Sequence, residues 1–543
     1  MAHRLTPSRA DFIGATGQEE VSRKLLTALL RENIGGLDQT PMQHPSLGLC
    51  VQHGPHLIPV RPEGLWHPLE ARSAEVWNED IRNWISALDF AGTLDLPGFD
   101  LLKEEFEAAQ QYSQYRLSQM PQLLAKQTTE QNLLFFDRLA ALLDHPIYPL
   151  PARLGFGPQD LQMYCPESSK GFLLRWVAVP AQHVFLSSKP PEIFPDFADV
   201  GLPDLPEHHL LPVHPHSLDH VESLTPDLQL KVAPLSFLKV HPTLSLRTVV
   251  LEDAPELHLK LPLRIRTLGY RNLRTLQPKC FKDGAVMQEV LRELCGPEVL
   301  LTDESHYGHA GTQDLGYLLR KYPALPKGSL QVGLASLLAP HPDGGRVIEH
   351  LTSSPRMLLR NTVQLLLETH LKLALRHGIV LEAHQQNTTL VLKPDGLHLL
   401  LRDNDAPRIH WEHFRSKHPD LAQKLLPFGD PCLPTDSVDA LADMFITIIL
   451  HLCVTSVLRQ AAEAGLIDLH TELQGVRHCI ERLLDEHQDS PFAGHFRKRL
   501  LEDVHFPSKT MLSAGTLFPK ADLGVSDINK SYRRQAPNYL RTP

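Results

Sequence analysis

Residues 256–273 read ELHLKLPLRIRTLGYRNL, a stretch that alternates between apolar and mostly basic residues. Successive side chains of a β-strand point to opposite faces, so this pattern predicts strand structure with an apolar face and a cationic face. The apolar positions are Leu257, Leu259, Leu261, Leu263 and Ile265. The cationic positions are His258, Lys260, Arg264 and Arg266.

The segment just before it, HPTLSLRTVVL at 241–251, predicts a second strand of the same sheet. Thr243, Ser245 and Arg247 would lie on one face, and the leucines between them on the other. If the two strands pair, hydroxyls and cations share one surface above an apolar core. Arginine and lysine are the donors that fit a polyphosphate, whereas a solvated strand face with salt bridges is the alternative.

On either side of this β-rich middle part, apolar residues recur with helical spacing. The helical stretches are 19–33, 75–90, 101–143 and 356–378, with a strand-like insertion at 47–60 and a hairpin around the turn KPDG at 393–396. The order predicts an α+β fold in three regions: a helical region 1–143, a β-rich region 144–354 and a mostly helical region 355–543.

Composition sets limits on the class of protein. The 543 residues include 42% hydrophobic and 21% charged residues and carry a net charge of −10, which excludes a disordered chain and argues against a dedicated nucleic-acid binder. The seven cysteines form no close pair, which favours reduced thiols in a cytoplasmic protein. No secretory signal is evident, and the apolar run 444–458 is interpreted as a buried helix, so no membrane partner is expected.

Common nucleotide-binding motifs, including the P-loop, do not occur in the sequence. A second polar group lies in GIVLEAHQQNTTLVLKPDGLHLLLRDND at 378–405. A strand would place Glu382 and His384 on one face, with Asn387 in a turn, and the hairpin would return the chain to Asp403. Because hard cations prefer oxygen ligands, this group suits a Mg²⁺–nucleotide site, and a polar cluster at a strand end is the alternative. The five histidines between 208 and 220 are interpreted as composition rather than a zinc site.

Four blocks, in order, resemble the IucA/IucC (aerobactin-synthetase) family of siderophore synthetases, which work independently of non-ribosomal peptide synthetases. They are DHPIYPLPARLGF at 144–156, LPVHPHS at 211–217, the 243–271 region, and GIVLEAHQQN with LLLRD at 378–403. The resemblance implies a cupped-hand fold with a helical thumb, antiparallel β-rich fingers and a mostly helical palm.

The resemblance also implies an activity. ATP and Mg²⁺ would activate a carboxylate of citrate, a related polycarboxylate or a citryl monoamide as an acyl-adenylate, with release of pyrophosphate. An amine, hydroxylamine or alcohol would then displace AMP. A homodimer is expected because relatives often form one.

Site roles follow residue by residue from the resemblance. The phosphate-binding set would be Ser245, Arg247, Lys260, Thr267 and Arg271, and the palm-side nucleotide set Glu382, His384, Asn387 and Asp403. Asp403 and Glu382 are the expected Mg²⁺ ligands. His145, Lys260, Arg271 and His384 are the expected catalytic residues, and Arg153 and Thr243 the expected contacts to the acid.

The chain departs from the family pattern mainly in its first block. Tyr148 stands where the family commonly has histidine, and a lysine is missing between Pro151 and Ala152. His216–Ser217 and Leu268–Gly269 also differ from the usual residues. These changes predict retained adenylation with an unusual acid substrate. The alternatives are a non-catalytic partner or scaffold subunit and a kinase-like phosphotransferase.

Overall fold

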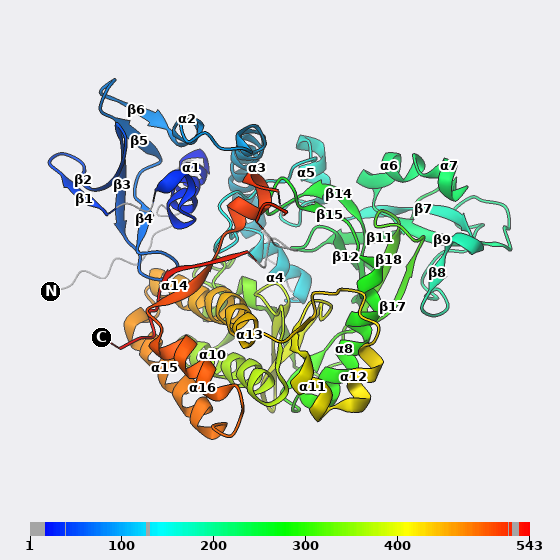
Figure 1. Cartoon of the computed structure of the whole chain (residues 1–543). Coiled ribbons are helices and arrows are strands. Elements are labelled where there is room, and N and C mark those ends of the chain that lie inside the picture. Colours follow the sequence, from blue (N-terminus) through cyan, green and yellow to red (C-terminus); the bar gives the residue numbers. More distant parts are fainter. Residues whose placement is uncertain (1–16, 38–39, 126–130, 520, 524–530, 543) are drawn as a thin grey trace.

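The computed structural model of the chain describes residues 17–37, 40–125, 131–519, 521–523 and 531–542. Helices are combined with mainly antiparallel sheets, which confirms the predicted α+β class. Figure 1 shows a small N-terminal sheet with its helices on one side, a larger sheet on the other, and a group of helices below them.

The N-terminal sheet has the strand order β1-β2-β3-β5-β6, and β4 also pairs with β3. Its strands are β1 (Met42–His44), β2 (Gly48–His53), β3 (His56–Pro62), β4 (Leu69–Ala71), β5 (Glu75–Asn78) and β6 (Asn83–Ser86). The helices of this part are α1 (Gly17–Arg31), α2 (Ala87–Gly92), α3 (Phe99–Ala125) and α4 (Leu133–Ala140). Strands β2 and β3 confirm the strand-like insertion predicted at 47–60.

The helix predicted over 75–90 is wrong for its first twelve residues, which form the β5–β6 hairpin. Trp77 pairs with Trp84 across this hairpin, and their rings meet edge to face at 5.6 Å. Trp77 and Trp84 are seven residues apart, a spacing that also places two residues on one face of a helix. The aromatic cross-strand contact stabilises the hairpin, so local periodicity could not separate the two structures.

The central sheet has nine strands in the order β10-β7-β11-β12-β13-β18-β17-β8, with β9 paired to β7. They are β7 (Phe172–Pro180), β8 (Phe185–Leu186), β9 (His208–Val213), β10 (Lys231–Val232), β11 (Phe237–Pro242), β12 (Thr248–Leu251), β13 (Ala254–Lys260), β17 (Asp303–His309) and β18 (Gly316–Lys321). Beside it lie α5 (Pro158–Tyr164), α6 (Leu218–Glu222), α7 (Thr225–Leu228), α8 (Phe281–Leu294) and the pair β14 (Leu263–Arg266) and β15 (Leu273–Arg274).

Residues 256–273 do not form one continuous strand. The sheet strand β13 ends at Lys260, and Pro262, which lacks an N–H, separates it from β14. Leu259, Leu261, Leu263 and Ile265 are buried as predicted and Leu257 is partly buried, but the expected single cationic surface is wrong. His258 is buried against Tyr322, Lys260 contacts Asp403, and Arg264 contacts Asp314.

The C-terminal part contains a sheet in the order β16-β22-β21-β19 and a smaller one in the order β20-β23-β24. The strands are β16 (Val299–Leu301), β19 (Leu330–Gly333), β20 (Ile379–Val380), β21 (Thr388–Lys393), β22 (Gly396–Leu401), β23 (Arg408–His410), β24 (Pro434–Thr435), β25 (His505–Lys509) and β26 (Tyr532–Pro537). The helices are α9 (Val347–Leu351), α10 (Pro355–Lys372), α11 (Trp411–Lys417), α12 (Pro419–Leu425), α13 (Val438–Met444), α14 (Ser456–Glu463), α15 (Leu469–Glu486) and α16 (Ala493–Arg497). The β21–β22 hairpin is confirmed, and it shares its sheet with strands from before residue 354.

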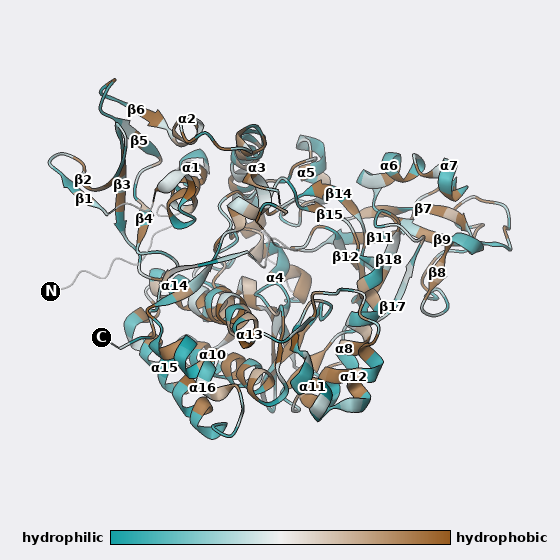
Figure 2. Cartoon of the chain, in the orientation of Figure 1, coloured by the Kyte–Doolittle hydropathy of each residue, from teal (hydrophilic) through white to brown (hydrophobic). Residues whose placement is uncertain are grey.

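Helix α13, the π-helical segment Phe445–Thr455 and α14 form one continuous helical stretch through the core. Val438–Glu463 is long and apolar enough by composition to span a membrane, but 94% of its most apolar window is buried inside the protein. The interpretation of 444–458 as a buried helix is confirmed. Figure 2 shows the surrounding helices α15 and α16 with hydrophilic residues on their outer sides.

His370 on α10 is fully buried, and burial lowers its pKa to about 4. The unfolded chain takes up this proton near pH 6.5, so the free energy of unfolding falls as the pH drops from 6.5 towards 4. His370→Leu removes this proton uptake. Between pH 7 and pH 5, we expect the free energy of unfolding of the variant to fall by about 2 kcal/mol less than that of the unaltered chain. Urea unfolding at both pH values measures the difference, and equal losses would contradict a neutral, buried His370.

Candidate active site

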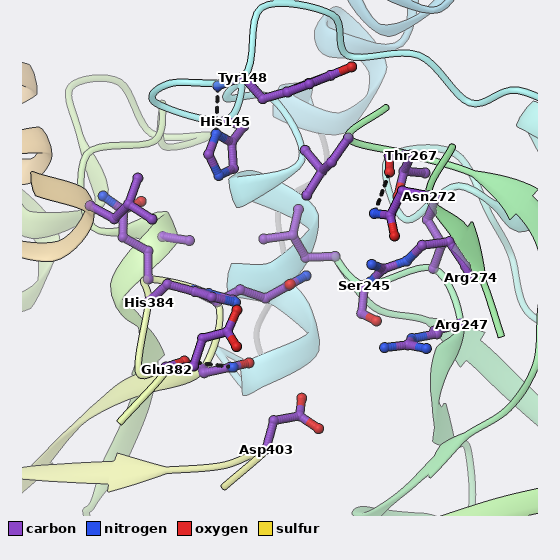
Figure 3. A pocket seen from close by; sticks show the side chains of 18 of the residues that line it. His145, Tyr148, Ser245, Arg247, Thr267, Asn272, Arg274, Glu382, His384 and Asp403 are labelled. Carbon is purple, nitrogen blue, oxygen red and sulfur yellow. Dashed lines mark hydrogen bonds between the residues drawn. The ribbon is translucent and has the colours of Figure 1, made fainter. Parts of the chain in front are cut away.

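A pocket of ≈ 700 Å³ lies between the central sheet and the C-terminal part. Eleven of the twelve predicted site residues line it, although their roles stay predictions. These residues are His145, Arg153, Ser245, Arg247, Lys260, Thr267, Arg271, Glu382, His384, Asn387 and Asp403. Figure 3 shows Ser245, Arg247 and Thr267 on one side, facing Glu382, His384 and Asp403 on the other.

Thr243 is the predicted residue that does not line the pocket. Its hydroxyl donates to the carbonyl of Thr248 at 2.7 Å and closes a turn between β11 and β12. The single strand predicted over 241–251 is therefore wrong, because Leu246 has a positive φ of 64° and reverses the chain. The turn presents Ser245 and Arg247 to the pocket from the end of the sheet.

Each of the three predicted phosphate-binding cations contacts an oxygen of the protein. Arg247 donates to the carbonyl of Thr275, and Arg271 Nε donates to the carbonyl of Thr516 at 3.1 Å. Lys260 Nζ lies 2.6 Å from Asp403 Oδ1. Carbonyl oxygens are neutral, so the two arginines keep their charge available to an anion, whereas the Lys260 charge is paired within the protein.

The turn that carries Arg271 packs against the C-terminal segment Ser513–Leu517. The Arg271 N–H donates to the carbonyl of Gly515 at 2.8 Å, and a Cβ on Gly269 would lie 2.6 Å from the Gly515 Cα. Gly269 also has a positive φ of 128°. This close backbone contact explains why the Leu268–Gly269 turn has no larger residue at position 269.

On the opposite side, β20 ends at Val380 and residues 381–387 form a loop and turn, so the strand predicted for Glu382 and His384 is wrong. Asn387 Nδ2 donates to the carbonyl of Glu382 at 3.1 Å, and the Asn387 N–H donates to the carbonyl of His384 at 2.8 Å. These bonds fold the segment back on itself. They hold Glu382, His384 and Asn387 close together in the loop.

His145 and His384 are half-buried in the pocket wall, and their pKa values fall to about 3 and about 4. Burial is the main cause, and the charge of Lys509 lowers both further. His145 Nδ1 accepts from the N–H groups of Ile147 and Tyr148, and His384 Nδ1 accepts from that of Gln386. Each neutral ring therefore carries its proton on Nε2 and can donate a hydrogen bond in the pocket.

Asp403 follows strand β22 and has a positive φ of 56°. Burial alone would raise the pKa of Asp403, but the charges of Arg320 and Lys260 hold it well below its usual range. Asp403 is thus a permanent carboxylate in the pocket wall. Together with the Glu382 carboxylate and the Asn387 amide it forms a set of hard oxygen donors, which fits Mg²⁺.

One departure in the first block, Tyr148, now has a structural explanation. The Tyr148 hydroxyl donates to Glu105 Oε1 on α3 at 2.6 Å, so its polar end is fixed in the core. Arg153 lies over the ring of Tyr112, with Cζ 4.2 Å from the ring centroid, and Nη2 donates to the Tyr112 hydroxyl at 3.2 Å. The aromatic ring orients the Arg153 guanidinium in the pocket wall.

Burial makes Glu105 unusual, since it raises the pKa of this carboxyl to about 7. Glu105 also accepts from the hydroxyl of Thr516. It therefore links α3, the first block and the C-terminal segment that supports Arg271.

Sequence reasoning missed several charged residues of the site. Lys509 on β25 is 1% exposed. Arg320 forms ion pairs with both Asp403 and Glu304, and Glu304 accepts a hydrogen bond from the Asp403 N–H. No quoted motif contains them, and they lie far from the motif residues along the chain. A lysine within the apolar segment FPSKTML was the one visible signal.

One group of described residues brings metal-ligand atoms together outside the pocket: His341, Asp343 and His350. The two imidazoles stack with centroids 3.7 Å apart and planes 21° from parallel. Nitrogen lone pairs lie in the ring planes, so stacked rings cannot direct them at one ion. This arrangement does not favour metal binding.

Comparisons with known proteins identify relatives across most of the chain. The model of the IucA / IucC family matches residues 132–339, and a model described as ferric iron reductase FhuF-like transporter matches residues 356–524.

Curated relatives include two proteins of Staphylococcus aureus. The chain is 28% identical to L-2,3-diaminopropanoate--citrate ligase over 292 residues, which is 47% of this chain and 50% of that protein. It is 27% identical to staphyloferrin B synthase over 453 residues, which is 73% of this chain and 76% of that protein. The match therefore spans only half the length of the first relative.

Solved structures show the same fold. Petrobactin biosynthesis protein AsbB from Bacillus anthracis has a TM-score of 0.74 at 16% identity, covering 97% of this chain and 96% of that chain. ATP-bound aerobactin synthetase IucA from Klebsiella pneumoniae has a TM-score of 0.71 at 17% identity, covering 96% and 100%.

Proposed function

Because the chain belongs to the IucA/IucC family of siderophore synthetases, we propose that it is an ATP-dependent ligase that joins a polycarboxylate to an amine, hydroxylamine or alcohol. The acid would be citrate, a related polycarboxylate or a citryl monoamide. One observation carries the proposal: Ser245, Arg247 and Thr267 face Glu382 and His384 across one pocket (Figure 3), and the same pocket is lined by Lys260, Arg271 and Asp403. This arrangement suits a metal–triphosphate and an anionic acid bound together.

In the first step, a carboxylate oxygen of the acid attacks the α-phosphorus of ATP, and the bond to pyrophosphate breaks. Arg247 and Arg271 stabilise the negative charge on the phosphate oxygens, and Lys260 joins them when it leaves Asp403. Asp403 and Glu382 would hold Mg²⁺, which when bound neutralises phosphate charge.

The neutral histidines act as donors in this scheme. His145 and His384 each offer Nε2–H to an oxygen of the acid or of the α-phosphate. Their low pKa values make them weak bases. Arg153 is placed to orient a second carboxylate of the acid.

In the second step, the nucleophile attacks the acyl carbon and AMP leaves. An amine attacks as its free base and loses its proton to water. Positioning next to the adenylate supplies the rate enhancement that a dedicated base would otherwise provide.

Pyrophosphate release with Mg-ATP, hydroxylamine and single polycarboxylic acids tests the proposal. We expect release that depends on one acid, together with equimolar AMP. Formation of ADP instead would favour the kinase-like alternative. If no acid leads to pyrophosphate release and the protein does not bind ATP, the ligase proposal is contradicted and a scaffold subunit is favoured.

A further inference from the structure

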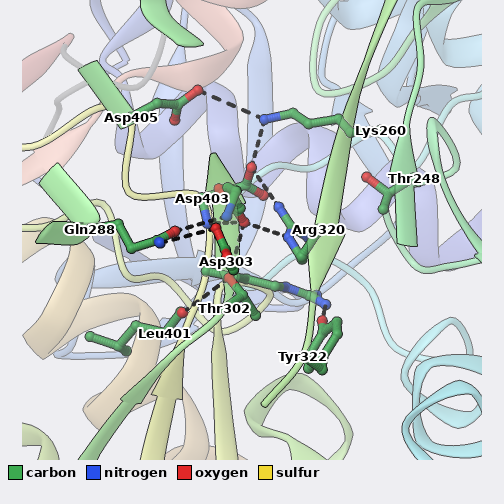
Figure 4. A network of polar contacts seen from close by, with 12 residues as sticks. Thr248, Lys260, Gln288, Thr302, Asp303, Arg320, Tyr322, Leu401, Asp403 and Asp405 are labelled. Carbon is green, nitrogen blue, oxygen red and sulfur yellow. Dashed lines mark hydrogen bonds and ion pairs between the residues drawn. The ribbon is translucent and has the colours of Figure 1, made fainter. Parts of the chain in front are cut away.

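Arg320 on β18 is a buried arginine that contacts two carboxylates at once. Its Nε lies 2.5 Å from Glu304 Oε1, and its Nη2 lies 2.7 Å from Asp403 Oδ1. The residue is 1% exposed and does not line the pocket. Figure 4 shows both Arg320 and Lys260 reaching Asp403, with Lys260 also directed towards Asp405.

Glu304 fixes this arrangement from β17. Its Oε1 accepts from Arg320 Nε, from the Thr302 hydroxyl at 3.1 Å and from the Asp403 N–H at 3.1 Å. The last bond holds the backbone of Asp403 where its φ is positive, a conformation that costs free energy for a non-glycine residue. Glu304 is itself held, because its N–H donates to Gln288 Oε1 on α8 at 2.8 Å.

The two oxygens of Asp403 differ in their surroundings. Oδ1 contacts both Lys260 Nζ and Arg320 Nη2. Among the described residues, no side-chain hydrogen bond ends on Oδ2, whereas Lys260 Nζ donates to Oδ1. Oδ2 is therefore the oxygen that remains for a ligand in the pocket.

We propose that Arg320, held by Glu304, is a positioning residue that fixes Asp403 through Oδ1 so that Oδ2 receives the divalent cation of the metal–nucleotide complex. The inference rests on the proposed function. Lys260 would leave Asp403 for the phosphates when the nucleotide binds. Arg320 stays, so the carboxylate keeps both its orientation and a charge partner throughout.

An arginine is required for this task because its planar guanidinium presents Nε and Nη2 to two different acceptors. A lysine at position 320 keeps the charge but offers one nitrogen, so it cannot hold Glu304 and Asp403 together. Partners that orient a metal ligand typically affect metal affinity by about 10–100-fold.

The test is Mn²⁺ binding to the full chain, measured by electron paramagnetic resonance with adenosine 5′-(α,β-methylene)triphosphate, which cannot be cleaved at the reacting bond. We expect Arg320→Lys to weaken Mn²⁺ binding by about 10-fold or more. Binding of the same analogue in EDTA should change by less than about twofold, since no phosphate contact is lost. Glu304→Gln should also weaken Mn²⁺ binding, and it provides a second variant if Arg320→Lys does not fold.

Arg499→Lys is the matched control. The Arg499 side chain is 2% exposed, like that of Arg320, and it contacts Asp443 and Asp503 away from the pocket. We expect it to lower the thermal midpoint of unfolding and to leave Mn²⁺ affinity unchanged. Unchanged Mn²⁺ affinity in both Arg320→Lys and Glu304→Gln, or an equal loss of metal-free analogue binding, would overturn the positioning role. If the unaltered chain binds no Mn²⁺–nucleotide complex, the proposed function fails and this inference with it.

Discussion

Lys260→Met is expected to lower kcat/KM for pyrophosphate release by on the order of 10²–10³-fold, the effect of removing one group that stabilises developing charge. Lys260 is 6% exposed and reaches the pocket from the end of β13. It is paired with Asp403 before the nucleotide binds, so it can move to the phosphates while Arg320 keeps Asp403 paired. The loss should appear in kcat as well as in KM, because charge on the phosphates increases during the reaction.

The same variant should fold, since Arg320 still pairs with Asp403. Mn²⁺ binding without nucleotide should become tighter, because a competing cation has been removed from Asp403. Lys321→Met on the neighbouring strand β18 is the control, since Lys321 is exposed and outside the pocket. Near-normal turnover by Lys260→Met would show that this lysine does not act on the phosphates.

Asp403→Asn is expected to reduce turnover by on the order of 10³-fold, because a neutral amide is a poor ligand for Mg²⁺ and the metal supplies several kcal/mol of charge stabilisation. The substitution also leaves two cations, Lys260 and Arg320, beside an uncharged side chain. Affinity for metal-free ATP should hold or improve, since a negative charge is lost from the pocket. Steady-state kinetics across Mg²⁺ concentrations, with calorimetry of ATP in EDTA, measure both effects.

Asp405→Asn provides the comparison for Asp403. Asp405 also lines the pocket, but its Oδ2 lies 3.8 Å from Lys260 Nζ, and Arg320 does not contact it. We expect less than about a tenfold loss for Asp405→Asn, in line with a partly exposed ion pair. Equal losses in the two variants would mean that turnover depends on the total negative charge of the pocket rather than on a metal ligand at Asp403.

The sequence alone determined the fold class and eleven of the residues that line the pocket. Alternating residues predicted the strands on either side of Pro262, and helical spacing predicted α1, α3 and α10. Three of the four motif blocks contain the eleven predicted residues that the structure brings into one pocket. Local patterns are informative there because burial of one face imposes a period on the chain.

The same local rules failed where the chain turns. Thr243, Glu382 and His384 were predicted on strands but lie in turns and loops, and residues 75–86 form a hairpin instead of a helix. A turn closed by a side-chain hydrogen bond, such as that from Thr243 to Thr248, has no periodic signal of its own.

Tertiary structure alone decided which residues surround the motif residues. Arg320, Glu304 and Lys509 reach the site from strands whose pairing depends on contacts far apart in the sequence. The charge of Arg320 helps to hold the pKa of Asp403 low, and burial, with the charge of Lys509, lowers the pKa values of His145 and His384. Electrostatic interaction depends on distance in space and on burial, and neither can be read from positions along a chain. The sequence thus identified the pocket residues, whereas the fold determined their charge states and the oxygen of Asp403 that remains for a ligand.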